Sequence, residues 1–85
     1  MRTRTLPLGT RNAVGKQIEE LRKRRGIRQY EFVARLQVNG FDISSISYSK
    51  LEAQRRRATD LELIKIAAVL GVPVQALFPE NLGSL

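Results

Sequence analysis

Apolar residues recur along the chain at the spacings of amphipathic helices, and short polar stretches with turn-forming residues separate them. The first set comprises Val14, Ile18 and Leu21. This spacing of four and three residues predicts a helix from about residue 10 or 12 to residue 25. Thr10 or Asn12 can cap its start, and Gly26 can adopt the left-handed conformation that ends it.

The chain is organised around residues 28–52, which have the most informative pattern. Their first part places Phe32, Val33 and Leu36 at helical spacing. This spacing predicts a second helix over about residues 29–36 or 37.

A loop over residues 37–43 follows, with Asn39-Gly40 as its turn. We expect the burial of Val38 or Phe41 to order this loop, because a free loop does not need two such apolar residues.

A short third helix over about residues 44–53 has two chemically different sides, and Asp42 or Ser44 can cap its start. Its packed side carries Ile43, Tyr48 and Leu51. Its outer side carries hydroxyls and one cation: Ser44, Ser45, Ser47, Ser49 and Lys50. Few structural roles require such an outer face. Reading the edges of DNA bases does require it, because serine and lysine donate to base acceptors in the major groove.

The C-terminal part predicts two further helices. Thr59 and Glu62 form a capping box that opens the fourth helix, and Gly71 stops it. Its expected buried face consists of Leu63, Ile66, Ala67 and Leu70. Pro73 then begins a short fifth helix over residues 74–78. Two residues at its end are expected to close the core: Leu77 and Phe78.

These elements predict one domain over residues 10–79, in keeping with a chain of 85 residues. Residues 1–9 are interpreted as a flexible basic arm with Arg2 and Arg4. The arm either enters a DNA minor groove or is simply a disordered start. Residues 80–85 are interpreted as a tail.

The composition limits the chemistry of the chain. It has no histidine or cysteine, which excludes disulfides, thiol or histidine catalysis, and metal sites with sulfur or imidazole ligands. No apolar run approaches the roughly 20 residues that cross a bilayer, and no secretory signal is recognisable. We therefore expect a cytoplasmic protein without cofactor, metal or small-molecule ligand. The net charge of +7 suits a polyanionic partner, although a merely basic surface has the same composition.

Over about residues 14–78 the chain resembles the Cro/repressor-type (Xre) helix-turn-helix regulators. Five motifs in the expected order carry the resemblance: Gly15-x-x-Ile18-x-x-Leu21-Arg22, Gln29-x-x-Phe32-Val33-x-x-Leu36, Ser47-Tyr48-Ser49-Lys50-Leu51-Glu52, Leu61 with Leu63 or Ile64 and Ala67, and Leu70-Gly71-Val72 followed by Leu77-Phe78. The resemblance implies an all-α, five-helix, lambda-repressor-like DNA-binding domain. The turn between its second and third helices is lengthened here, and the helix over residues 44–53 becomes the recognition helix.

The resemblance also assigns roles to the outer face of that helix. The residues that it directs toward base edges are Ser45, Ile46, Ser49 and Lys50. Ser44 and Ser47 are directed toward phosphate. Ile46 either packs on a thymine methyl group or contacts the long loop at Phe41.

Further positively charged and polar residues flank the recognition helix. The resemblance places the loop with Arg55, Arg56 and Arg57 on the sugar-phosphate backbone, so at least two of the three are expected to contact phosphate; the alternative is a solvated charge run. Gln29 either contacts a phosphate or braces the recognition helix. Glu52 is expected to pair with a nearby arginine. The basic run at the end of the first helix suits the helix dipole, and part of it can also face phosphate: Arg22, Lys23, Arg24 and Arg25.

We therefore predict a sequence-specific DNA-binding transcriptional regulator and not an enzyme. The regulator is expected to be a repressor that binds double-stranded DNA as a homodimer on an inverted repeat. The candidate dimer surface comprises Val74, Leu77, Phe78 and Leu82, which can equally belong to the core of the monomer. Two alternatives are the DNA-binding antitoxin of a toxin–antitoxin pair and a helical protein-interaction module without DNA binding.

Overall fold

The computed structural model describes residues 9–79, and these fold into four α-helices and one short 3₁₀ helix. The elements are α1 (Gly15–Arg24), α2 (Gln29–Val38), α3 (Ser45–Glu52), α4 (Asp60–Leu70) and η1 (Val74–Leu77). No strand occurs in the described part of the chain, which confirms the all-α class. None of the helices within it is both long and apolar enough to span a membrane.

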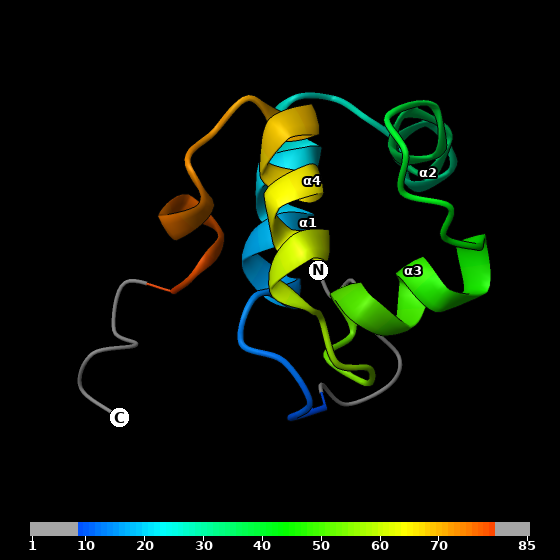
Figure 1. The fold of residues 1–85 in the computed structure, drawn as a ribbon. Helices are drawn as coiled ribbons and strands as arrows, with labels where there is room; N and C mark the ends of the chain where they lie inside the picture. Colours follow the sequence, from blue (N-terminus) through cyan, green and yellow to red (C-terminus); the bar gives the residue numbers. More distant parts are fainter. Residues whose placement is uncertain (1–8, 80–85) are drawn as a thin grey trace.

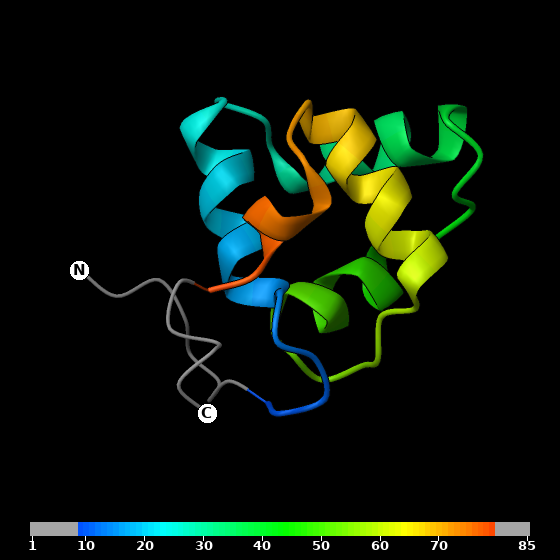
Figure 2. The same ribbon diagram turned by 60° about the vertical axis from the view of Figure 1, so that its left-hand side comes forward.

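The helices surround one core, to which every element contributes. In Figure 1, α4 lies in front of α1, while α2 and α3 lie to their right. Figure 2 shows η1 between α1 and α4, and η1 contacts both helices. The fully buried apolar side chains include Ile18, Phe32, Leu36, Tyr48, Leu51, Ile66 and Leu77. The α3 helix contacts α1 and α2, so its position is fixed by two neighbours.

The first helix begins later than the sequence suggested, at Gly15 instead of residue 10 or 12. Asn12 still closes the turn before it, because its Oδ1 accepts from the backbone N–H groups of Val14 and Gly15 at 3.0 and 2.8 Å. A side chain at Gly15 would overlap the carbonyl oxygens of Leu51 and Glu52. Glycine therefore allows the start of α1 to approach the end of α3 closely.

The connection between α2 and α3 is shorter than predicted, because α2 continues to Val38. The loop then covers residues 39–44, and Gly40 takes a φ of +91° in its turn. Phe41 is only 8% exposed, whereas Val38 is 86% exposed. The expectation that burial orders this loop is thus confirmed, and Phe41 is the residue that provides it.

Two side chains hold the same loop from outside. Gln37 donates to the carbonyl oxygen of Ile43 at 2.9 Å, and Lys65 of α4 donates to that of Gly40 at 2.9 Å. The backbone N–H of Phe41 also donates to the carbonyl of Leu36 at 2.8 Å. These hydrogen bonds hold the backbone of the loop while Phe41 packs into the core.

The predicted fifth α-helix is wrong: η1 is a single 3₁₀ turn of four residues. Its hydrogen bonds run from Ala76 to Pro73 and from Phe78 to Gln75. Phe78 is extended, with φ −96° and ψ 149°, and Pro79 follows it. Since proline disfavours helical geometry in the residue before it, the chain has no room to propagate an α-helix here.

The fourth helix begins and ends as predicted. Thr59 accepts from the N–H of Glu62 at 3.2 Å, and Glu62 accepts from the N–H of Thr59 at 3.0 Å. Gly71 ends the helix in the left-handed conformation. Its buried residues are Ile66, Ala67 and Leu70, with Leu63 partly buried. The predicted arm and tail lie almost entirely outside the described residues, which begin at residue 9 and end at residue 79.

Candidate nucleic-acid interface

The α3 helix has one buried side and one exposed side. Ser44 caps it by accepting from the N–H of Ser47 at 3.1 Å. Tyr48, Leu51 and Glu52 are buried, and the tilted rings of Phe32 and Tyr48 pack with centroids 5.5 Å apart. The exposed residues of the helix and its cap are Ser44, Ser45, Ile46, Ser49 and Lys50, with Ser47 partly exposed.

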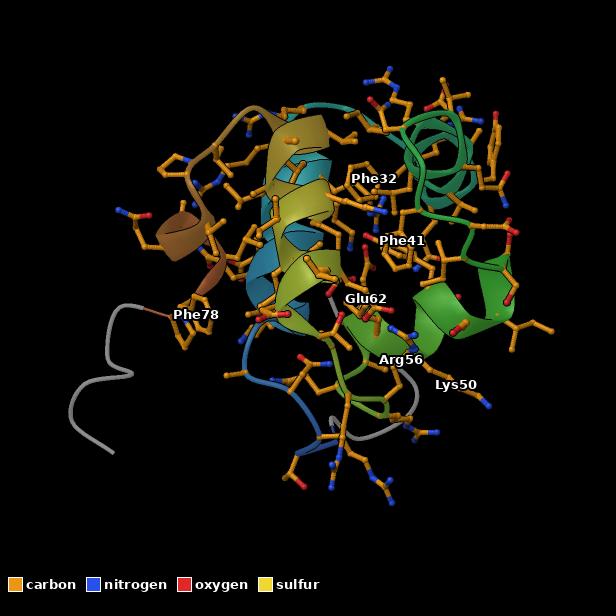
Figure 3. The ribbon with its side chains drawn as sticks, in the orientation of Figure 1. Phe32, Phe41, Lys50, Arg56, Glu62 and Phe78 are labelled. Carbon is orange, nitrogen blue, oxygen red and sulfur yellow. The ribbon has the colours of Figure 1, made fainter. Side chains whose placement is uncertain are left out.

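The exposed side carries both an aliphatic and a cationic side chain. Ile46 is 72% exposed while Phe41 is buried, so Ile46 does not pack into the loop core. The interpretation of Ile46 as a loop contact is therefore not supported. Lys50 extends away from the body of the protein (Figure 3). The surface thus offers hydroxyls, one aliphatic group and one ammonium group at its outer edge.

A buried carboxylate fixes this helix to the rest of the fold. Glu52 is 1% exposed and accepts from Nε of Arg22 at 2.7 Å, from Nη2 of Arg22 at 3.2 Å and from the hydroxyl of Tyr48. Arg22 also donates to the carbonyl of Ile27 at 2.8 Å. The expected pairing of Glu52 with an arginine is confirmed.

The protonation of this cluster follows from its surroundings. Burial lowers the pKa of the Arg22 guanidinium, but the hydrogen bond and charge of Glu52 outweigh it, so that pKa is raised. Burial, together with the Glu52 carboxylate, raises the pKa of the Tyr48 phenol far above its ordinary value. The phenol therefore stays protonated and donates a hydrogen bond to Glu52.

Gln29 connects the buried cluster to the exposed side of α3. Its Nε2 donates to Oε1 of Glu52 at 3.0 Å, and its Oε1 accepts from the hydroxyl of Ser49 at 3.0 Å. Of the two roles considered for Gln29, bracing the recognition helix is the one visible in the structure. Arg28 precedes α2 at the cap position, and its backbone N–H donates to the side chain of Glu31 at 2.9 Å, so Glu31 supplies a cap that the Arg28 side chain cannot.

The three arginines after α3 differ in their surroundings. Arg56 is partly buried and donates through Nη1 and Nη2 to the two oxygens of Glu62, both at 3.1 Å (Figure 3). Arg55 and Arg57 are exposed. Burial raises the pKa of Glu62, but hydrogen bonds from Arg56 and the N–H of Thr59, with the charge of Arg56, outweigh it, and the pKa is lowered. Arg56 thus has an internal structural role that its sequence position did not indicate.

Long-range hydrogen bonds that no sequence motif indicated hold the loop after α3. Nδ2 of Asn12 donates to the carbonyls of Leu51 and Arg56 at 3.0 and 2.8 Å. Nε2 of Gln54 donates back to the carbonyl of Asn12 at 3.0 Å. The N–H of Gly9 donates to the carbonyl of Ala53 at 2.8 Å. These contacts join residues about 40 positions apart, so no local pattern could reveal them.

The described residues contain no group of three or more His, Cys, Asp or Glu side chains arranged to hold a metal ion.

Comparison with known protein families gives a match over most of the described helices. A sequence model described as helix-turn-helix matches residues 18–77, which run from the middle of α1 to the end of η1. This range covers well over half of the chain and includes all of α2 and α3. A search of curated proteins found no match.

Proposed function

The chain belongs to the Cro/C1-type helix-turn-helix family, a DNA-binding domain family found in Xre-type regulators, and on this premise we propose that it is a sequence-specific transcriptional repressor. One observation supports this proposal most directly. The outer side of α3 is exposed and chemically suited to base edges, while its inner side is locked by Tyr48, Leu51 and Glu52. A rigidly held helix with an exposed polar face is what direct readout requires.

The proposed contacts fall into two classes. Ser45, Ile46, Ser49 and Lys50 read bases from the exposed side of α3. Ser44 and Ser47 at the helix start contact phosphate, as do the exposed Arg55 and Arg57 that follow α3, while Gln29 braces the helix. Phosphate contacts supply affinity and orientation without sequence information, and base contacts supply the choice of site.

We include a homodimer in the proposal, because a recognition helix of eight residues reaches only a few base pairs. Only part of the dimer surface expected from the sequence is exposed in the monomer. Leu77 is fully buried in the monomer, and Val74 and Phe78 pack partly against the core. Leu82 lies outside the described residues. Phe78 lies on the side of the molecule away from Lys50 (Figure 3).

Selection of bound sequences from a random DNA pool tests the proposal. We expect an enriched palindrome whose half-sites are about one helical turn apart. The matched control is Lys50→Ala, which leaves the buried side of α3 intact and should weaken the enrichment. Absence of any enriched sequence with folded protein would contradict the proposal and favour a protein-interaction module.

The antitoxin alternative has one observation in its favour. Val38 of α2 and Leu61 and Ile64 of α4 are large apolar residues that are more than half exposed. Such residues suit a protein partner, although singly they are common on surfaces. Copurification with the product of the adjacent gene would distinguish the two functions, because a repressor that acts alone should not retain it.

A further inference from the structure

The orientation of the Gln29 amide is determined by its neighbours. Its amide nitrogen faces Oε1 of Glu52, which already accepts from Arg22. A flipped amide would place the Gln29 oxygen against a carboxylate oxygen, where neither atom can donate. The flip would also turn the amide nitrogen toward Ser49. Gln29 therefore directs its oxygen, and only its oxygen, toward Ser49.

This orientation commits the proton of the Ser49 hydroxyl to a hydrogen bond with Gln29. A serine hydroxyl has one proton and two lone pairs, and its proton normally rotates to suit whichever partner is present. Here the 3.0 Å contact with Oε1 of Gln29 requires Ser49 to be the donor, because an amide oxygen has no proton to give. The two lone pairs of an otherwise exposed Oγ are left for another partner.

We propose that Ser49 reads DNA as a hydrogen-bond acceptor only, and so selects a base with an amino group in the major groove. Two bases fit this description, adenine through N6 and cytosine through N4. Guanine O6 and thymine O4 are acceptors, and each would face the lone pairs of Ser49 without a proton between them. The inference deepens the proposed function and rests on it, since it concerns which base the recognition helix chooses.

The next residue provides the opposite chemistry. Lys50 carries a donor-only ammonium group and extends away from the protein (Figure 3). Adjacent positions on one helix thus present an acceptor and a donor. Gln29, which does not need to touch the base, is the positioning residue that makes Ser49 an acceptor.

The test begins with the selected operator and the position at which Ser49→Ala alters base preference. At that position the adenine is replaced by purine, or the cytosine by pyrimidin-2-one, each of which lacks the amino group. We expect wild-type binding to fall about five- to tenfold, the usual effect of one hydrogen bond. The same replacement should have no further effect on Ser49→Ala. In 7-deazaadenine only the N7 acceptor is lost, and binding through Ser49 should be retained.

Two further variants separate positioning from structure. Gln29→Met removes the acceptor of the Ser49 proton, so the freed hydroxyl can donate and the discrimination against guanine and thymine should shrink. Ser45→Ala, on the same exposed helix face, should leave the Ser49-dependent position unchanged. Melting curves confirm that each variant is folded.

Each contrary result has its own meaning. An enriched operator in which Ser49→Ala alters no position, or alters one that carries guanine or thymine, overturns this inference and leaves the proposed function intact. Unchanged discrimination in folded Gln29→Met overturns the positioning role. A wild-type protein that enriches no sequence overturns both the proposed function and this inference.

Discussion

Arg22 of α1 is joined to Glu52 of α3 by two hydrogen bonds, at 2.7 and 3.2 Å, and both side chains are buried. The pair connects α1 to α3, and Gln29 adds α2 through its contact with Glu52. The orientation of the exposed side of α3 therefore depends on a polar cluster in the interior. Loss of either partner leaves the other charge buried without its counter-charge.

We expect Arg22→Met to destabilise the fold by about 3–5 kcal/mol, the usual effect of removing one member of a buried ion pair. Lys23→Ala is the matched control, since Lys23 pairs with Glu19 at 3.2 Å but is 48% exposed. Exposed helical pairs contribute only about 0.3–0.5 kcal/mol. Urea denaturation of both variants measures the difference. Equal losses in the two would show that the buried pair has no special role.

The loop before α3 provides a second contrast. Phe41→Ala should destabilise by about 3–5 kcal/mol, because it empties a buried aromatic site. Val38→Ala, three residues earlier and 86% exposed, should change stability by no more than about 0.5 kcal/mol. Thermal melts of the two variants provide the comparison. A Phe41→Ala protein as stable as Val38→Ala would mean that the loop is not anchored through its aromatic ring.

Much of this fold could be predicted from local sequence, because local rules determine it. The spacing of Val14, Ile18 and Leu21 identified the first helix, and the Thr59–Glu62 capping box gave the start of α4. The buried side of α3 also followed from periodicity. The type of the fifth helix could not be predicted reliably. Pro73 and Pro79 enclose a segment that is long enough for only one turn, and one turn can be either α or 3₁₀.

The site was less predictable, because its geometry depends on distant partners. Arg22 looked like one member of a basic run, and only the packed fold shows that it faces Glu52 while Lys23 faces solvent. Arg56 looked like its two neighbours until its pairing with Glu62 distinguished it. Sequence patterns give the type of a side chain but not which of several similar ones is buried.

Glu62 should make stability depend on pH. Its folded pKa is lowered below the ordinary value of 4.5, so its stabilising contribution is fully present above that value and disappears as pH falls through the folded pKa. We therefore expect Glu62→Gln to be less stable than wild type at neutral pH, with the gap closing in acid below about pH 4.5. Urea denaturation across this pH range measures the gap. When Glu62→Gln is instead compared with wild-type Glu62 in an Arg56→Gln protein, most of that pH dependence should vanish. A stability gap that keeps the same pH dependence there would contradict the role of Arg56.

The last prediction separates base readers from phosphate anchors. Lys50 is exposed on α3, where a lysine can donate to guanine O6 and N7 with about 1–3 kcal/mol of discrimination. Arg57 is exposed in the loop beyond the helix, where we propose phosphate contact. It is a cleaner test than Arg56, whose substitution would also break the pair with Glu62.

Because phosphate carries no base identity, Arg57→Ala should weaken binding to operator and scrambled duplexes by similar factors. It should also reduce the slope of log K against log salt by about one unit. Lys50→Ala should instead lower the ratio of operator to scrambled binding. Titrations of both variants at several salt concentrations measure these quantities. If Lys50→Ala preserves the ratio, the assigned reading face is wrong. If Arg57→Ala changes the ratio strongly and leaves the salt slope unaltered, the two roles have been exchanged.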